Sequence, residues 1–459
     1  MKLDMNMKVM IVDDSGTMRN MMKSMLGKLG FQNIVDASDG MDAVNKMKEQ
    51  KPDLIISDWN MPNMDGMGLL KWVRDNPDSK DTPFIMATAQ GDKTQEKAVK
   101  DAGGNNHIAK PFTEEMLKEK IEQTFGLQDT SEQVSRIPKV VNGKVQMKIA
   151  HIQITDHLAL GILKHQIETG EVSPKYFDLE TLCMPGWNPV QEALEKNTVD
   201  GAFVLAPIAM DLFGFDVPIQ LVLLAHKNGS IFVRNSMYNE EDYGAVKNFF
   251  KYKVIDIPHK MSIHNMLAHK YLTEMGLKPG VPGPNDAINV RFEVVPPVQM
   301  PVIMKENDNI GGFIVAEPIG SNAIAKGIAE LQFLSSEMWD NHPCCVAAMQ
   351  KAFIDAYPDA VFEFTSLLVQ AGKFIEKQQD RAAEIAVAFL DPQKKLGLTT
   401  EVLKKVLTAP KGIKMDNLYP VLEDLDAIQR YMHDSMNIGV LIDIEKFVDL
   451  RFADAACRQ

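Results

Sequence analysis

The stretch LIISDWNMPNMDG at residues 54–66 decides the fold of the first part of the chain. It is a short apolar run that ends in a carboxylate, Asp58, and then breaks into a polar turn with proline and glycine. A run of this length, bounded by turn residues, predicts a strand that is buried on both faces. In parallel sheets, functional groups gather at the carboxyl ends of such strands.

Three further runs of the same kind accompany this stretch, and segments with helical spacing lie between them. The strand-like runs are KVMIV at 8–12, FIMAT at 84–88 and HIAKP at 107–111, and the helical segments span 18–29, 41–48 and 93–102. Buried strands that alternate with helices predict a parallel sheet covered on both faces, the doubly wound α/β class. The strand ends then bring together Asp13, Asp14, Asp58, Thr88 and Lys110.

These five side chains form a chemically coherent set. Clustered carboxylates repel one another unless a cation joins them. Oxygen ligands suit Mg²⁺, which also binds phosphoryl groups. One carboxylate can then attack phosphorus and form an aspartyl phosphate, while a hydroxyl and an ammonium hold the phosphoryl oxygens.

The order and spacing of these residues resemble the receiver domains of two-component response regulators, and in particular the single-domain chemotaxis receivers. The resemblance covers residues 7–126 and is carried by VDDS at 12–15, SDWNMPNMDG at 57–66 and KPF at 110–112. It implies a flavodoxin-like, five-stranded parallel sheet and phosphorylation by a sensor histidine kinase. The residues implied are Asp58 as phosphoacceptor, Asp13, Asp14, Asp58 and the Asn60 backbone carbonyl for Mg²⁺, and Thr88 and Lys110 for the phosphoryl group.

The sequence departs from this family at one position. The family places tyrosine or phenylalanine three residues before the lysine, as a rotamer switch coupled to the threonine, and this chain has His107 there. An ordinary half-exposed strand histidine and a working switch are both open interpretations. Control of the flagellar motor is therefore not the leading functional prediction.

Charge and composition exclude several classes of function. The 459 residues carry a formal net charge of −13, and neither residues 1–126 nor the remainder has a basic excess. This argues against general electrostatic binding of nucleic acid or of an anionic membrane surface. The sequence has no apolar run of signal-peptide length and none of 18 or more residues, so we expect a cytoplasmic protein without membrane insertion.

The second part of the chain again alternates strand-like and helical patterns. Residues 127–145 lack sustained periodicity and predict a linker between a domain at 1–126 and another at 146–459. Strand-like runs lie at 148–152, 201–205, 221–225, 254–257, 290–294 and 311–315, and helices are predicted at 346–357, 360–378 and 381–390. No basic recognition helix appears, which argues against a DNA-binding output domain.

This part resembles the substrate-binding proteins of nitrate, bicarbonate, sulfonate and taurine transporters over residues 146–455. The segments that carry the resemblance are AFVLAP at 202–207, AHKNGS at 225–230, PHKMSIH at 258–264, VPPVQMP at 295–301, AEPIG at 316–320 and NHPCC at 341–345. It implies a two-lobed α/β domain with the type II periplasmic-binding fold. A small molecule, an oxyanion or a small organic compound, is then expected in a cleft between the lobes.

Candidate cleft residues follow the predicted strands or begin helices, where backbone N–H groups favour anions. They are Thr155, Asp156, His157, Trp187, Ala206, Ser230, Ser262, His264 and Glu317. Trp187 fits either a surface lid or a core position. Glu317 fits either a cleft wall or a strand-end cap, and the histidines fit ligand contacts or ordinary capping and surface positions.

The four cysteines are few and irregularly spaced. They are Cys183, Cys344, Cys345 and Cys457, a pattern that predicts neither a disulfide framework nor a zinc site. We interpret the adjacent pair Cys344 and Cys345 as small buried fillers at the start of a helix.

Together these patterns predict a cytoplasmic response regulator whose second domain binds a small molecule instead of DNA. It is not expected to be an enzyme beyond its own phosphoryl transfer and autodephosphorylation. Two alternatives stay open for the second part. One is an enzyme like the thiamin-pyrimidine synthases, whose cytosolic members use histidine and a longer cysteine motif than this chain has. The other is a scaffold that binds only partner proteins.

Overall fold

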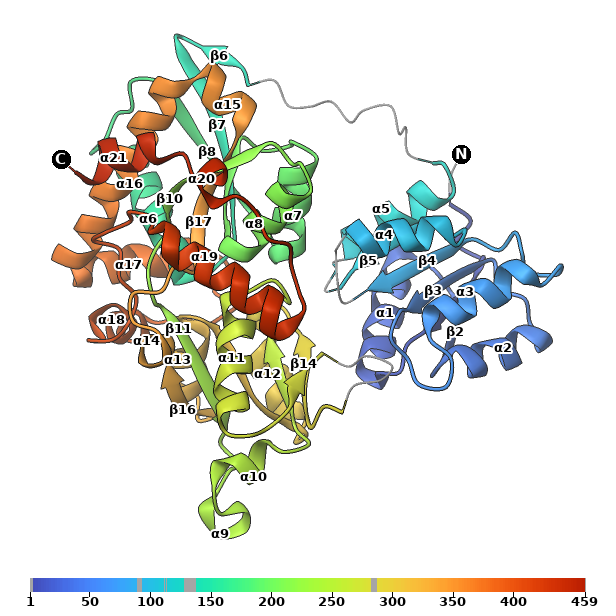
Figure 1. The fold of residues 1–459 in the computed structure, drawn as a ribbon. Helices are drawn as coiled ribbons and strands as arrows, with labels where there is room; N and C mark the ends of the chain where they lie inside the picture. Colours follow the sequence, from blue (N-terminus) through green and yellow to red (C-terminus); the bar gives the residue numbers. More distant parts are fainter. Residues whose placement is uncertain are drawn as a thin grey trace. The chain divides into compact units, whose positions relative to one another are not determined.

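The computed structural model describes residues 3–88, 93–110, 112, 114–127, 138–281 and 287–458. The chain separates into two compact units, the first within residues 3–127 and the second within residues 138–458 (Figure 1). The first unit has one sheet with a hydrophobic core on each face, and the second unit has two sheets and its own hydrophobic cores. Across these described ranges, no helix combines the length and the apolar character that crossing a bilayer requires.

The first unit is built on a five-stranded sheet in the order β2-β1-β3-β4-β5, and every neighbouring pair is parallel. Its strands are β1 (Lys8–Val12), β2 (Asn33–Ala37), β3 (Leu54–Asp58), β4 (Phe84–Thr88) and β5 (Asn106–Ala109). Its helices are α1 (Gly16–Leu29), α2 (Gly40–Glu49), α3 (Gly66–Asp75), α4 (Lys93–Asp101) and α5 (Glu114–Thr124). The doubly wound α/β fold predicted from the sequence is confirmed.

Alternation along the strands divides the apolar side chains between two cores. Val9 and Ile85 pack on the face that α1 and α5 cover. Met10 and Met86, their neighbours in sequence, pack on the face that α2, α3 and α4 cover. Successive strand residues point to opposite faces, so a strand that is apolar throughout supplies both cores.

The turn that follows β3 is fixed by close packing at its end. Asp65 caps α3, because its Oδ1 accepts a hydrogen bond from the backbone N of Gly68 at 2.7 Å. A Cβ on Gly66 would lie 2.1 Å from the backbone oxygen of Asp58. Only glycine permits this approach, which holds the residues after Asp58 close to the strand end.

The second unit consists of two lobes, each with a six-stranded sheet. The first lobe has the strand order β10-β17-β9-β7-β6 with β8 paired to β7, and the second lobe has the order β13-β14-β12-β15-β11-β16. First-lobe strands are β6 (Val140–Val141), β7 (Lys144–His151), β8 (Phe177–Cys183), β9 (Gly201–Leu205), β10 (Ile219–Leu224) and β17 (Cys345–Gln350). Second-lobe strands are β11 (Ser230–Asn235), β12 (Val254–Ile257), β13 (Pro279–Gly280), β14 (Val290–Val294), β15 (Ile310–Ala316) and β16 (Ala329–Leu334).

Helices accompany the strands of both lobes. Those between β7 and β17 are α6 (Leu158–Glu168), α7 (Trp187–Glu195), α8 (Ala206–Gly214), α9 (Glu240–Tyr243), α10 (Val246–Phe250), α11 (Ile263–Glu274), α12 (Met300–Glu306), α13 (Ile319–Ala325) and α14 (Ser335–Met338). The later helices are α15 (Lys351–Ala356), α16 (Pro358–Lys377), α17 (Gln379–Leu390), α18 (Thr400–Thr408), α19 (Leu422–Arg430), α20 (Ile444–Phe447) and α21 (Leu450–Cys457).

The segment predicted to be a linker, 127–145, ends in ordered structure. Residues 128–137 lie outside the described ranges, but β6 and the start of β7 form an antiparallel hairpin. Its turn is Asn142-Gly143, and both residues have positive φ, at 52° and 82°. An Asn-Gly pair between strand-like residues, here Val141 and Lys144, is a short-range signal for this kind of hairpin.

Two short segments connect the lobes, and we call them the crossovers. Residues 225–229 lead from β10 to β11, and residues 339–344 lead from α14 back to β17. The crossovers run side by side, because the backbone N of Asn228 donates to His342 O at 3.0 Å and the backbone N of Ala225 donates to Cys345 O at 2.9 Å.

The helix predicted at 346–357 is wrong over its first half. Residues 345–350 form β17, which lies between β10 and β9 and is antiparallel to both. The strand is buried along its whole length. A short apolar run of this kind cannot be assigned to a strand or a helix from periodicity alone. Cys344 and Cys345 therefore lie at the start of a strand and not of a helix.

Helices α16 and α17 pack on the first lobe, whereas α18 also contacts α13 of the second lobe. α16 contacts α6 and α21, and α17 contacts α6 and α18. The helices predicted at 360–378 and 381–390 are confirmed, with ends that differ by no more than two residues. The backbone of α16 approaches the backbone at Met415 closely, because a Cβ on Gly372 would lie 2.1 Å from the backbone oxygen of Met415.

We expect Gly372→Ala to lower the free energy of unfolding of the chain by about 1–3 kcal/mol, because the clash is with rigid backbone and not with a flexible side chain. The matched control is Gly186→Ala, whose backbone is extended and whose Cβ would meet no atom within 4 Å. Denaturant unfolding of both variants measures the effect. Equal unfolding free energies for the two variants would contradict the packing described here.

Candidate functional site

The first candidate site lies at the carboxyl ends of the strands in the first unit. Asp13 follows β1, Asp58 ends β3, Thr88 ends β4 and Lys110 follows β5, and all four side chains are buried. The Lys110 Nζ lies 2.5 Å from Asp13 Oδ2 and 2.6 Å from Asp58 Oδ1. Parallel strands thus bring residues nearly a hundred positions apart into one hydrogen-bonded group, which we call the acid pocket.

Lys110 stabilises the two carboxylates of the acid pocket, which repel each other. Burial raises the pKa of Asp58, and the neighbouring Asp13 carboxylate raises it further, while Lys110 opposes both effects. Burial alone would lower the pKa of Lys110, but the Asp58 and Asp13 carboxylates raise it above its usual range. A buried ammonium between two carboxylates compensates charges that would be costly to bury alone.

The remaining residues predicted for this site lie beside the acid pocket. Asp14 follows Asp13 and is partly exposed, and Asn60 stands two residues after Asp58 and is also partly exposed. Carboxylate and carbonyl oxygens are the ligands that Mg²⁺ takes in proteins, so this donor set fits that ion. His107 lies within β5, with its Nε2 3.9 Å from the carboxylate of Glu96 on α4.

The second candidate site lies where the two lobes of the second unit meet. The nine residues predicted to line the cleft are all buried: Thr155, Asp156, His157, Trp187, Ala206, Ser230, Ser262, His264 and Glu317. Thr155 joins the lobes, because its backbone N and its Oγ1 donate to the backbone oxygen of Glu317 at 2.8 and 2.7 Å. We call this region the interlobe centre.

Several of these side chains meet one another, and others serve the local backbone. Ser230 Oγ lies 3.0 Å from His264 Nε2, and the Trp187 ring packs edge-on against His157. Trp187 is therefore a core residue and not a surface lid. Ser262 is the N-cap of α11, and the backbone N of Ala206 donates to Cys344 O at 2.8 Å.

Sequence reasoning missed four residues of the interlobe centre. His226 lies on the first crossover, His342 and Cys344 on the second, and Cys345 begins β17. His226 Nε2 is 3.0 Å from Asp156 Oδ2, and both residues are fully buried. All four missed residues stand in segments that carry the family resemblance, AHKNGS and NHPCC, which is the signal that could have found them.

Burial dominates the titration of the histidines in this region. It lowers the pKa of His264 to about 3 and that of His342 to about 4. Burial opposes protonation of His226 as well, but the Asp156 carboxylate raises the pKa of this histidine to about 10. Within the described part of the chain, no partner is found for Asp156 Oδ1, His157 Nε2 or Trp187 Nε1. Buried polar atoms without partners are rare in proteins and call for an explanation such as a bound water or ion.

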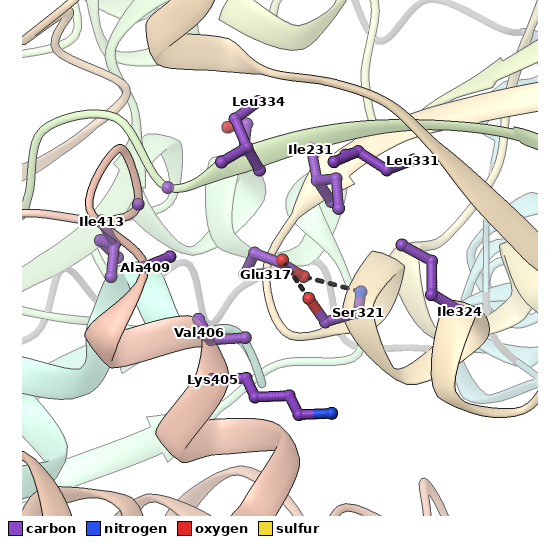
Figure 2. Close-up of a pocket in the computed structure, with 13 residues that line it drawn as sticks. Ile231, Glu317, Ser321, Ile324, Leu331, Leu334, Lys405, Val406, Ala409 and Ile413 are labelled. Carbon is purple, nitrogen blue, oxygen red and sulfur yellow. Dashed lines mark hydrogen bonds between the residues drawn. The ribbon is translucent and has the colours of Figure 1, made fainter.

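A cavity of about 130 Å³ adjoins the interlobe centre (Figure 2). Ser230 and Glu317 line it together with residues of α13 and α18. Glu317 accepts hydrogen bonds from the backbone N and the Oγ of Ser321, so its carboxyl group is held at the cavity wall. The volume is below that of typical pockets for drug-sized ligands, which suits a molecule of a few heavy atoms.

Two family models match the chain. The response regulator receiver domain matches residues 9–122. The NMT1-like family matches residues 142–390, which is more than half of the chain.

Known relatives of the first unit are chemotaxis proteins. The "Probable chemotaxis protein CheY" of Rhizobium etli is 46% identical over 126 residues, which are 28% of this chain and 98% of that protein. Chemotaxis protein CheY-3 of Vibrio cholerae is 43% identical over 123 residues, which are 27% of this chain and 95% of that protein.

Solved structures similar to the second unit include binding proteins of transport systems. The ligand-binding component of an ABC-type import system from Staphylococcus aureus, solved with zinc bound, matches with a TM-score of 0.59 at 21% identity over 68% of this chain and 99% of that one. The periplasmic nitrate-binding protein NrtA from Synechocystis matches with a TM-score of 0.59 at 18% identity. The match covers 70% of this chain and 90% of that one. The two-lobed fold predicted from the sequence is confirmed.

Glu317 gives this site a pH-dependent stability. Burial raises its pKa to about 7 from an ordinary value of 4.5, the hydrogen bonds from Ser321 oppose the shift, and the Asp156 carboxylate adds to it. Between pH 4.5 and 7 the folded state keeps a proton that the unfolded state has lost, so this contribution to stability is complete below pH 4.5 and is lost as the pH rises through 7. The expected loss is about 3 kcal/mol.

We expect Glu317→Gln to remove this loss. Buried histidines with lowered pKa values, such as His264 and His342, act in the opposite sense and destabilise the fold as the pH falls below about 6.5. The difference in unfolding free energy between the original chain and the variant isolates Glu317, since the histidines are common to both. Denaturant unfolding at several pH values between 4.5 and 8 measures this difference. If the unfolding free energies of the two proteins changed with pH in parallel, Glu317 would not be the group with the raised pKa.

Proposed function

Because the chain belongs to the NMT1-like family and begins with a response regulator receiver domain, we propose that it is a cytoplasmic two-component response regulator with a small-molecule sensor as its second domain. A sensor histidine kinase phosphorylates Asp58 in this proposal. The chain catalyses no reaction beyond phosphoryl transfer to this residue and its hydrolysis. The domain boundaries proposed are 1–126 and 146–459, with the hairpin at 140–145 as the entry to the second domain.

The acid pocket is the observation that supports phosphorylation. Asp58 is buried next to an ammonium, and its Oδ1 contacts Lys110 Nζ at 2.6 Å. Lys110 is positioned to hold an oxygen of a phosphoryl group on Asp58, and Thr88 ends the neighbouring strand. Asp13, Asp14 and the Asn60 carbonyl would hold Mg²⁺, which neutralises the negative charge that gathers on the phosphoryl oxygens during transfer.

We expect acetyl phosphate with Mg²⁺ to phosphorylate the chain on one residue, and Asp58→Asn to abolish the product. The control is Asp65→Asn in the same turn, because asparagine caps a helix about as well as aspartate does. Intact-mass spectrometry under mild acid detects the added phosphoryl group. Phosphorylation of Asp58→Asn at the original level would overturn the assignment of Asp58.

The interlobe centre supports the binding of a small molecule. It is the place where both lobes contribute buried polar groups, and the described residues leave several of those groups without partners. The solved binding proteins with this fold include a nitrate-binding protein and an alkanesulfonate-binding protein. We propose an oxyanion or a small organic compound as ligand, with Thr155, Asp156, His157, Trp187, Ala206, Ser230, Ser262, His264 and Glu317 as the lining.

A thermal-shift series on the full chain tests this binding, with nitrate, bicarbonate and alkanesulfonates as probes. We expect a saturable rise of the thermal midpoint with one of them, because a ligand that binds only the folded state stabilises it. His264→Asn should weaken that rise, whereas His433→Asn, a change at an exposed histidine, should not. A chain that no probe stabilises would instead favour a scaffold that binds partner proteins.

A further inference from the structure

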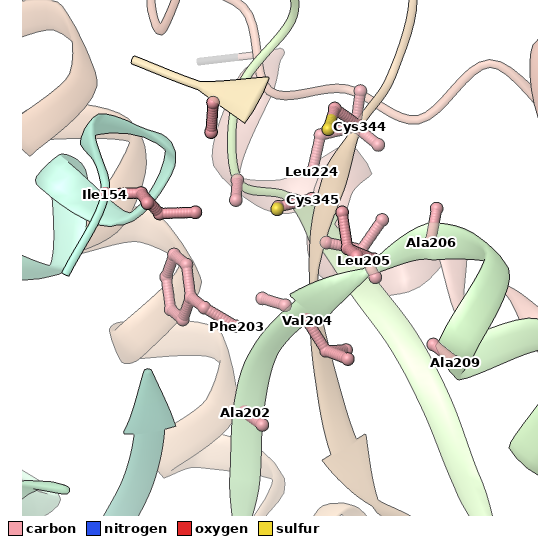
Figure 3. Packing of buried hydrophobic residues seen from close by; sticks show 14 of the residues in the cluster. Ile154, Ala202, Phe203, Val204, Leu205, Ala206, Ala209, Leu224, Cys344 and Cys345 are labelled. Atoms are coloured by element: carbon pink, nitrogen blue, oxygen red, sulfur yellow. The ribbon is translucent and has the colours of Figure 1, made fainter. Parts of the chain in front are cut away.

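Four side chains of metal-ligating type meet at the junction of the two lobes. Asp156 lies on the short helical turn Thr155–His157 after β7, His226 lies on the first crossover, and Cys344 and Cys345 end the second crossover and begin β17. All four are fully buried, and their ligand atoms lie within 4.8 Å of one another. Figure 3 shows the two cysteines within the apolar core beside Leu205 and Leu224.

The spacing of the four side chains has the scale of a tetrahedral metal site. Asp156 Oδ2 lies 3.0 Å from His226 Nε2, 3.5 Å from Cys345 Sγ and 3.8 Å from Cys344 Sγ. A tetrahedral Zn²⁺ with bonds of about 2.0–2.3 Å separates its ligand atoms by about 3.3–3.8 Å. Small adjustments of side chains therefore bring these four groups around one ion.

From this geometry we propose that Asp156, His226, Cys344 and Cys345 bind one divalent transition-metal ion of the Zn²⁺ class. Two thiolates, one imidazole and one carboxylate match the preferences of Zn²⁺, whereas Mg²⁺ and Ca²⁺ prefer oxygen ligands alone. Four ligands from the protein leave no position for a substrate, so the ion has a structural role.

An ion pair alone does not explain this cluster. A pair of charged Asp156 and His226 accounts for their contact, but the described residues offer Asp156 Oδ1 no hydrogen-bond partner. It also gives the two thiols only a weak interaction, since sulfur is a poor hydrogen-bond donor. A divalent metal ion gives every member of the cluster a strong interaction. Its binding releases the protons of the two thiols and of His226, and it compensates two of the three negative charges that the carboxylate and the two thiolates then carry.

An ion at this location would link segments that connect the two lobes. His226 belongs to one crossover and Cys344 to the other, and Asp156 belongs to the first lobe next to the Thr155 contact with Glu317. An ion bound here joins both crossovers to the first lobe and holds the junction around which lobes of this kind move. The site goes beyond the proposed function, because it needs neither phosphorylation nor an organic ligand, and it assigns Asp156 of the proposed ligand lining to the metal ion.

Co²⁺ titration of the full, metal-free chain tests the proposal. We expect one equivalent to bind with a thiolate-to-cobalt charge-transfer absorption and the intense visible bands of tetrahedral Co²⁺, and Zn²⁺ to abolish both. Zn²⁺ at about 100 times its Kd should raise the thermal midpoint by roughly 5 °C, in the presence of excess Mg²⁺. Absence of the charge-transfer absorption in the folded chain would overturn the proposal.

The variants separate this site from others on the chain. Cys344→Ser/Cys345→Ser should lose the charge-transfer absorption, whereas Cys183→Ser, at an exposed cysteine, should keep it. Asp58→Asn should keep it as well, so failure of the receiver assignment leaves this test intact. Should the double variant not fold, the single variant Cys344→Ser is expected to bind Co²⁺ with a weaker charge-transfer absorption. An unchanged spectrum in a folded cysteine variant would exclude the thiols as ligands.

Discussion

The pairing of the two crossovers is the constraint on which the second unit depends. Each lobe has its own sheet, but the chain passes from one lobe to the other twice. It does so through two adjacent segments that are joined by backbone hydrogen bonds. This pairing leads β17 back into the first sheet between β9 and β10. It also places polar side chains of both segments in a region from which water is excluded, where each requires a partner.

Both units bury carboxylates, and each unit surrounds them with different partner groups. In the first unit, buried carboxylates form ion pairs with the Lys110 ammonium at the ends of parallel strands. In the interlobe centre, Asp156 faces a histidine and two thiols. Hard oxygen ligands around an ammonium suit transient binding of Mg²⁺ and a phosphoryl group, whereas thiolates and imidazole suit a firmly held transition metal. The side chains of the first centre thus suit the proposed phosphoryl transfer, and those of the second suit the proposed metal ion.

Sequence reasoning brought the residues of the acid pocket together correctly, because they stand at recognisable strand ends. Asp13, Asp58 and Lys110 each end or follow a short apolar run, and the parallel topology that such runs predict requires these ends to meet. It failed at β17, because the run after Cys345 is apolar at every position and is followed by a true helix. It also placed the hairpin at 140–145 within a linker, although the Asn142-Gly143 turn was visible.

The sequence by itself determined the two fold classes, the acid pocket and most residues of the interlobe centre, because periodicity and strand-end chemistry are local properties of the chain. Only the tertiary structure decided that His226, Cys344 and Cys345 join Asp156. These residues are 70 to almost 190 positions apart from Asp156 and follow no metal-binding spacing. Their proximity arises from the pairing of the crossovers, a long-range arrangement that leaves no periodic signal along the chain.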